Sequence, residues 1–115
     1  MYAIQMHTPG SPDVLTFEET STPQLQHSTD LLIRLKAAGV NPVDTKLRSR
    51  GTFYPDKTPT ILGCDGSGIV EAVGNKVTRY KPGDEVYFCN GGIGDHPGNY
   101  AEMAVINEAF AAHKP

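Results

Sequence analysis

Glycine and proline divide this chain into segments that are too short for long helices. The sequence has 12 glycines and 9 prolines among 115 residues, and both residue types mark turns. About six apolar runs of strand length lie between the turn signals, at residues 2–6, 15–18, 31–37, 68–73, 85–89 and 100–106. No apolar pattern of period 3.6 continues long enough for a substantial helix. The chain is therefore predicted to be one mainly β domain.

Two neighbouring segments carry the clearest local patterns. In residues 31–37, leucine, isoleucine and alanine occupy every second position, which predicts a half-buried strand. The segment Asn41–Arg48 follows, with Pro42 at a plausible first helical position and Asn41 before it as a cap. This order predicts one or two helical turns directly after the strand.

Charge and hydropathy exclude several classes of function. The net charge is −3, which gives no general attraction to nucleic acid or to anionic membranes. No apolar stretch approaches the ~20 residues of a membrane helix, and residues 1–6 lack the features of a signal peptide. Two cysteines are too few for a disulfide framework. We therefore expect a cytoplasmic protein that binds neither nucleic acid nor membranes.

Glycine clusters at residues 63–68 and 91–94 resemble phosphate-binding loops only superficially. A dinucleotide fingerprint requires G-x-G-x-x-G between a strand and a helix, and neither cluster is followed by a helical pattern. We interpret these glycines as sites where two backbone segments pass closely. Residues 81–84 read Lys-Pro-Gly-Asp, which predicts a type II turn with a positive φ at Gly83.

Five side chains are of types that ligate metals: Cys64, Asp65, Cys89, Asp95 and His96. Their spacing matches no local ligand motif. An isolated cysteine on a strand is more often a small buried apolar residue. The residues alone therefore favour a structural role for both thiols.

A short basic segment, Lys46, Arg48 and Arg50, lies close to the aromatic residues Phe53 and Tyr54. Three such charges in an acidic chain usually form a solvated face. The alternative is that they meet a cofactor phosphate or a negative charge that develops during a reaction.

Four segments, in this order, resemble the medium-chain dehydrogenase/reductase superfamily and, within it, the quinone oxidoreductase branch: residues 38–44 (AGVNPVD), 59–74 (PTILGCDGSGIVEAVG), 81–86 (KPGDEV) and 98–102 (GNYAE). The resemblance implies that residues 1–115 form the N-terminal, GroES-like catalytic domain. Such a domain is a partly open β-barrel with one or two short helices, and it lacks the Rossmann domain. The resemblance also implies that residues 110–115 lead onward into that cofactor domain.

The same resemblance bears on metal use. Zinc-dependent relatives have a cysteine at the position of Asn41 and a His-Glu pair at the position of Cys64-Asp65. An amide is a poor zinc ligand, so we expect no zinc. Asp44 stands where zinc enzymes orient the ligating histidine, and we expect that role to lapse here. Cys64 and Asp65 remain a partial ligand set for adventitious metal.

The resemblance further implies hydride transfer from NADPH to a quinone or another α,β-unsaturated carbonyl compound. Asn41, Pro42 and Val43 are expected to line the nicotinamide side of the cleft. The Asn41 amide would meet the developing negative charge, Tyr54 would donate a proton or stack on a flat ring, and Lys46 would add positive charge. For Tyr54 and Lys46, simple packing and solvation are equally plausible.

Two other functions remain open at this point. One is a zinc-dependent alcohol dehydrogenase that recruits Cys64, Asp65 and His96. The other is a stand-alone GroES-like module that binds a partner and catalyses nothing. If the cofactor domain is missing, the isolated chain should be inactive, and its uncovered apolar surface should favour a homo-oligomer.

Overall fold

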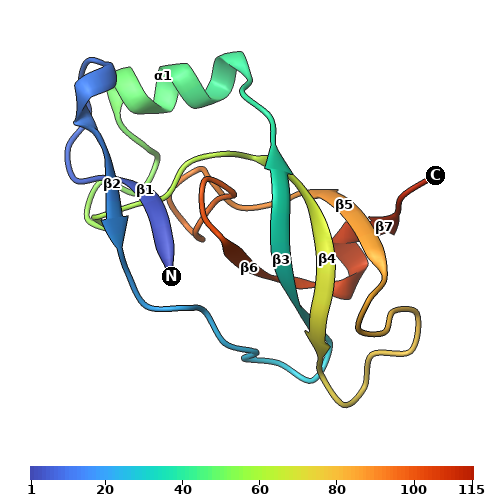
Figure 1. Cartoon of the computed structure of the whole chain (residues 1–115). Coiled ribbons are helices and arrows are strands. Elements are labelled where there is room, and N and C mark those ends of the chain that lie inside the picture. Colours follow the sequence, from blue (N-terminus) through green and yellow to red (C-terminus); the bar gives the residue numbers. More distant parts are fainter.

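The computed structural model describes all 115 residues and contains two antiparallel sheets and one α-helix (Figure 1). The elements are β1 (Tyr2–Met6), β2 (Leu15–Glu19), β3 (Asp30–Ala38), α1 (Pro42–Arg50), β4 (Asp65–Val73), β5 (Glu85–Cys89), β6 (Met103–Asn107) and β7 (Ala111–His113). Short 3₁₀ turns cover Pro12–Val14 and Glu108–Phe110. No helix is long and apolar enough to cross a membrane.

The larger sheet has five antiparallel strands in the order β6-β3-β4-β5-β7, and the smaller one is the hairpin of β1 and β2. Irregular registers between β3 and β4 interrupt the ladder at two places and add local twist. Single bridges, Ala3 to Ala101 and Met6 to Thr60, attach the hairpin to the rest of the chain. The sheets stay open, so the prediction of a mainly β, partly open GroES-like fold is confirmed.

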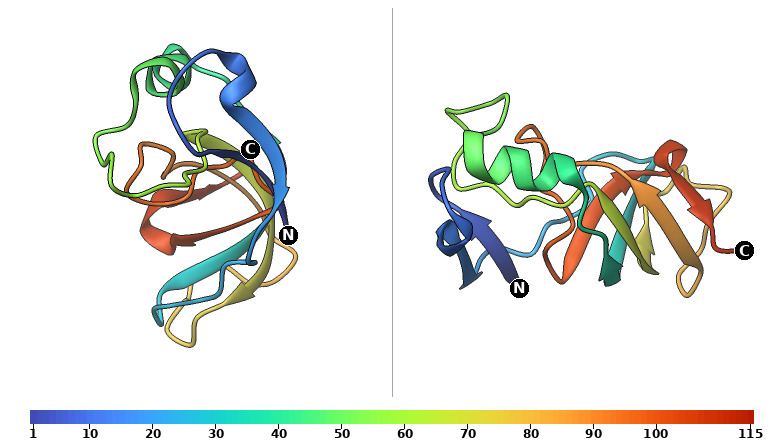
Figure 2. Two further views of the ribbon diagram at one scale, coloured as in Figure 1. Left: turned by 90° about the vertical axis from the view of Figure 1, so that its left-hand side faces the viewer. Right: turned by 90° about the horizontal axis from the view of Figure 1, so that it is seen from above.

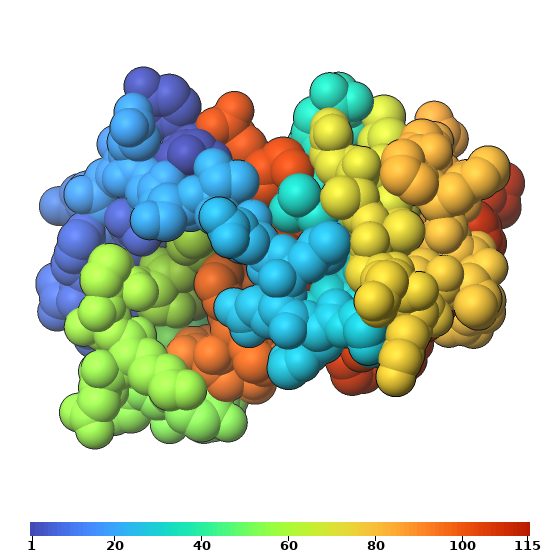
Figure 3. Space-filling view, turned by 90° about the horizontal axis from the view of Figure 1, so that it is seen from below, coloured from blue at the N-terminus to red at the C-terminus, as the bar shows by residue number.

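Helix α1 begins near the upper end of β3 in Figure 1 and runs toward the end of the molecule that holds the hairpin, and Figure 2 shows it to one side of the hairpin strands. Seen from below, the segment of residues 20–30 crosses between the hairpin and the five-stranded sheet (Figure 3). The chain therefore has an elongated shape, with principal extents of 41 × 27 × 22 Å.

Two separate apolar clusters hold these parts together. The larger belongs to the five-stranded sheet and comprises seven buried residues: Leu31, Ile33, Val70, Tyr80, Val86, Phe88 and Ile106. The smaller cluster lies under α1 and comprises Met6, Leu47 and Leu62. Because burial of apolar area is the main stabilising contribution, the sheet carries most of the stability.

The close-approach interpretation of the first glycine cluster is correct at Gly68. A Cβ there would lie 2.1 Å from the carbonyl oxygen of Arg34 on the neighbouring strand, so no larger residue fits. The turn at residues 81–84 is also as predicted. Gly83 has a φ of +96°, and the amide of Asp84 donates to the carbonyl of Lys81.

Several predicted boundaries are wrong by a few residues. β4 begins at Asp65 and not at residue 68, because glycines 66 and 68 take part in the ladder. β6 begins at Met103 and not at residue 100. Strand β7 was not predicted, since three residues carry too little pattern to show periodicity.

Candidate functional site

The site begins where β3 ends and α1 starts. Asn41 has extended backbone angles, and Pro42 sets the first helical φ. The Asn41 backbone amide donates to Asp44 Oδ2 at 2.8 Å, and the Asp44 amide donates to the Asn41 carbonyl at 3.0 Å. These bonds fix the first turn of the helix and place Asn41 at its N-terminus.

The Asn41 side chain reaches across to the start of β4. Its Nδ2 donates to Asp65 Oδ2 at 2.7 Å, and the backbone amide of Gly39 donates to the Asp65 carbonyl at 3.3 Å. A bond to a carboxylate is among the stronger hydrogen bonds in proteins. Two segments that are 24 residues apart in the chain thus meet at one amide.

Tyr100 enters the same cluster from the far end of the chain. Its hydroxyl lies 2.9 Å from the Gly39 carbonyl oxygen and 3.2 Å from Asp44 Oδ2, and these two acceptors share its single proton. The sequence analysis missed Tyr100 as a site residue. It belongs to the matched segment at residues 98–102, but nothing local to it indicates contact with Asp44.

Asp44 is only 3% exposed, and its Oδ1 has no hydrogen-bond partner. The hydrogen-bond partners of Asp44 include no histidine. The carboxylate contacts the Asn41 backbone and the Tyr100 hydroxyl in place of a histidine. A buried carboxylate with one unpaired oxygen opposes stability, so such an arrangement is typical of functional regions.

The local electrostatics keep the neighbouring acids protonated. Burial, followed by the Asp44 carboxylate, raises the pKa of the Cys64 thiol to about 11. The same two causes raise the pKa of Tyr100 to about 12. Burial and then the bond to Asp65 also raise the pKa of Cys89. At neutral pH these groups are hydrogen-bond donors and not nucleophiles.

The cysteines are less buried than the sequence predicted. Cys64 is half-buried and Cys89 is exposed, because Cys89 ends β5 on the solvent side, where its register partner is Asp65. The interpretation of Cys89 as a small core residue is therefore wrong.

The other predicted site residues lie at the rim. Pro42 and Val43 are exposed in the first turn of α1, and Lys46 is exposed one turn further along. Tyr54 is 40% exposed, and the Lys57 ammonium lies 5.4 Å from its ring centre. No hydrogen bond or ion pair joins Lys46 or Tyr54 to Asn41, so the structure leaves their roles as predictions.

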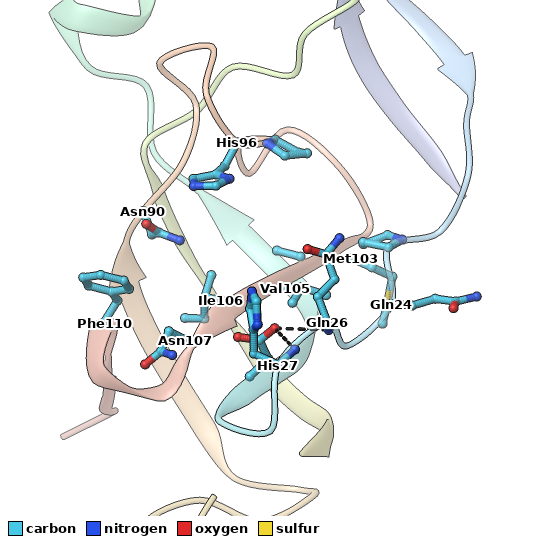
Figure 4. Close-up of a pocket in the computed structure, with 14 residues that line it drawn as sticks. Gln24, Gln26, His27, Asn90, His96, Met103, Val105, Ile106, Asn107 and Phe110 are labelled. Atoms are coloured by element: carbon cyan, nitrogen blue, oxygen red, sulfur yellow. Dashed lines mark hydrogen bonds between the residues drawn. The ribbon is translucent and has the colours of Figure 1, made fainter. Parts of the chain in front are cut away.

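A separate cavity of about 270 Å³ lies along β6. His27, Asn90, His96, Asn107 and Phe110 surround it (Figure 4). Its nearest carboxylate is that of the buried Asp30, which accepts from the backbone amides of residues 26 and 27. None of the predicted catalytic or cofactor residues lines this cavity.

The donor set around Asn41 does not fit zinc. Asn41 offers only a neutral amide oxygen, and amides bind zinc poorly. No three His, Cys, Asp or Glu side chains are arranged to hold a metal ion. His96 points into the cavity along β6 and does not complete a set with Cys64 and Asp65.

The two ends of a dinucleotide need different surroundings, an apolar surface for the nicotinamide ring and backbone amides for the pyrophosphate. Asn41 lies between two exposed apolar side chains, Val40, which is 74% exposed, and Val43. Neither glycine cluster forms a pyrophosphate site, which needs the N-terminus of a helix. The first cluster continues into β4, and the second precedes no helix.

Comparison with known proteins places this geometry in context. Residues 27–115 match the family model of the alcohol dehydrogenase GroES-like domain. The chain is 38% identical over 105 residues to quinone oxidoreductase from Mus musculus, an alignment that covers 91% of this chain and 30% of that protein.

Two further relatives are a zinc-type alcohol dehydrogenase-like protein and a protein solved with NADPH. The chain is 37% identical over 86 residues to a zinc-type alcohol dehydrogenase-like protein from Staphylococcus aureus, which covers 75% of this chain and 24% of that protein. A mycobacterial protein solved in complex with NADPH superposes with a TM-score of 0.84 at 35% identity, over all of this chain and 34% of that one. The chain spans about a quarter to a third of the length of these relatives.

Proposed function

The chain belongs to the alcohol dehydrogenase GroES-like domain family, within the medium-chain dehydrogenases/reductases, and on that premise we propose that it is the substrate-side catalytic domain of an oxidoreductase. The proposed reaction is hydride transfer from NADPH to a quinone or another α,β-unsaturated carbonyl compound, without zinc. The proposal includes a cytoplasmic location and a second, nucleotide-binding domain outside residues 1–115.

One observation carries this proposal. The amide of Asn41 stands where zinc-dependent members have a ligating cysteine, and Asp65 holds it at 2.7 Å. An amide nitrogen has two protons, and the bond to Asp65 uses one of them. The second proton has no partner in the protein, so it is available to a substrate oxygen.

The chemistry follows from charge. NADPH supplies the hydride, and its arrival at the conjugated carbon places negative charge on the substrate oxygen. A fixed N–H donor stabilises that charge in a site with little water. Asn41 supplies such a donor and cannot itself be deprotonated, which suits a reaction that needs no metal to polarise the carbonyl.

Rim residues complete the proposal. Val43 and Pro42 would contact the nicotinamide ring, and Lys46 would add positive charge near the reacting oxygen. Tyr54 would stack on the ring of a quinone. The mycobacterial relative in complex with NADPH supports the choice of cofactor, and the murine quinone oxidoreductase supports the choice of substrate.

The test uses the whole polypeptide encoded by the reading frame that contains this chain. With 1,4-benzoquinone as acceptor, Asn41→Ala should lower kcat for NADPH oxidation by about 10²-fold, the usual loss when one donor to a developing anion is removed. Asn75→Ala, an exposed asparagine in the turn after β4, is the matched control. An Asn41→Ala enzyme as fast as the control would refute the proposed function.

A further inference from the structure

Two carboxylates accept hydrogen bonds from Asn41, one from its own helical turn and one from strand β4. Asp65 accepts from the side-chain nitrogen at 2.7 Å, and Asp44 accepts from the backbone nitrogen at 2.8 Å. The terminal torsion of an asparagine side chain has no sharp preference of its own, so a hydrogen bond is needed to orient the amide. The bond to Asp65 orients the amide of Asn41, and the bond to Asp44 restrains its backbone.

Tyr100 contacts the groups that hold the backbone of Asn41. Its hydroxyl donates to Asp44 Oδ2, and it also reaches the carbonyl of Gly39, two residues before Asn41. The ring itself lies against the backbone of Gly63, where a Cβ would be 2.8 Å from Tyr100 Cδ1. Gly63 has a φ of +102°, so a glycine is needed there both for conformation and for space.

The polar network is therefore built more tightly than a helix cap requires. An N-terminal cap needs only one side-chain acceptor. Here two carboxylates, Asp44 of α1 and Asp65 of β4, both accept from Asn41, and a phenol from a third segment donates to Asp44. The Asp44 Oδ1 is left buried without a hydrogen-bond partner. Such a cost at one position is expected where the geometry of a side chain matters for chemistry.

We propose that Asp65 is a positioning residue that orients the Asn41 amide toward the substrate, and that Tyr100, through Asp44, positions the Asn41 backbone. This proposal rests on the proposed role of Asn41. It assigns no contact with substrate to Asp65 or Tyr100, which act only through the asparagine.

Two variants test it in the whole enzyme. Asp65→Ala removes the acceptor and should lower kcat by about 10- to 100-fold with little change in KM, because small misplacements of a catalytic group have effects of this size. Asp65→Asn keeps an oxygen acceptor at the same place and should restore most of the activity. Equal losses in Asp65→Ala and Asp65→Asn would overturn the proposal, because only the carboxylate charge would then matter.

The matched control for Tyr100→Phe is Tyr80→Phe, in the apolar cluster of the five-stranded sheet. Tyr80 is buried in the five-stranded sheet, and its hydroxyl donates to the Ala111 carbonyl at 2.7 Å. Tyr100→Phe should lower kcat several-fold, whereas Tyr80→Phe should change only stability. If the two variants have the same kcat, Tyr100 is merely structural.

NMR of the 115-residue chain supplies a measurement that does not depend on activity. In the wild type, one Nδ2 proton of Asn41 should resonate downfield of the other, because it is bonded to a carboxylate. In Asp65→Ala the two protons should return to the positions of a free amide, while the Asn75 amide protons stay unchanged. An Asn41 signal that is identical in both proteins would overturn the proposal.

The proposed function and the positioning role of Asp65 can be refuted separately. If Asn41→Ala is fully active, the proposed function is wrong, whatever the NMR result. If Asn41→Ala is impaired while Asp65→Ala is not, the function stands and the positioning role of Asp65 is wrong.

Discussion

The five-stranded sheet and the α1 region differ in how much apolar surface they bury and in how completely their buried carboxylates are hydrogen-bonded. The sheet buries seven apolar side chains in one cluster, and its buried carboxylate, Asp30, is bonded to two backbone amides. The α1 region buries three apolar side chains and retains a carboxylate oxygen without a partner at Asp44. The contrast indicates that the sheet supplies stability, while the α1 region holds a polar arrangement that is not the most stable one available.

The largest effect is expected in the sheet. Ile33 is fully buried at the centre of the cluster, so Ile33→Ala should lower the free energy of unfolding by about 2–5 kcal/mol. Urea denaturation followed by circular dichroism measures this change. A loss below about 1 kcal/mol, the level of an exposed site, would contradict the assignment of stability to the sheet.

A smaller effect is expected at the glycine under Tyr100. Gly63→Ala combines an unfavourable positive φ with a contact of 2.8 Å to the ring and should cost about 1–3 kcal/mol. Gly83→Ala is the control, because Gly83 also has a positive φ but nothing within 4 Å of its Cβ position. The difference between the two variants in thermal denaturation isolates the contact with Tyr100. Equal losses would show that the ring does not press on Gly63.

Alkaline pH should weaken the fold through the α1 region. The pKa of Cys64 is raised from 9.0 to about 11 and that of Tyr100 from 10.0 to about 12, in both cases first by burial. Between these values the unfolded chain releases a proton that the folded chain keeps, so stability falls as pH rises from about 9 to 12.

Melting temperatures measured from pH 8 to 11.5 should therefore decline, and Tyr100→Phe should decline less steeply above pH 10. Tyr80→Phe keeps both shifted groups and serves as the control. A Tyr100→Phe curve parallel to that of the wild type would rule out the phenol as a source of the decline.

The smallest effect on stability, within about 1 kcal/mol in either direction, is expected for Asp44→Asn. The amide keeps one oxygen for Asn41 and Tyr100, and it replaces the unpaired carboxylate oxygen by a neutral group. Urea denaturation measures the change. A loss as large as that of Ile33→Ala would erase the contrast between the two regions.

Local pattern predicted the sheet better than the site. Residues 2–6 and 85–89 were predicted as strands with the boundaries that the structure has, because turn residues flank each of them. Asn41 was singled out by its place in a family motif, and its cap position follows from Pro42. Tyr100 and the bond between Asn41 and Asp65 could not be predicted, since both join segments that are far apart in the chain. The contact between Asp44 and Tyr100 could not be predicted for the same reason, because 56 residues separate the two in the chain.

Self-association of the isolated chain remains a prediction. Val40, Val43, Phe53 and Tyr54 are all exposed around α1 and the loop that follows it. Sedimentation velocity over a wide range of concentration measures the association, and a monomer at every concentration would contradict it.

We propose that hydride transfer at this site depends on an oriented asparagine and not on a metal ion. Metal analysis combined with NADPH oxidation by the whole enzyme, before and after dialysis against a chelator, tests this directly. We expect zinc well below one equivalent and an unchanged rate. One equivalent of zinc whose removal abolishes the rate, and whose return restores it, would show that the reaction depends on the metal.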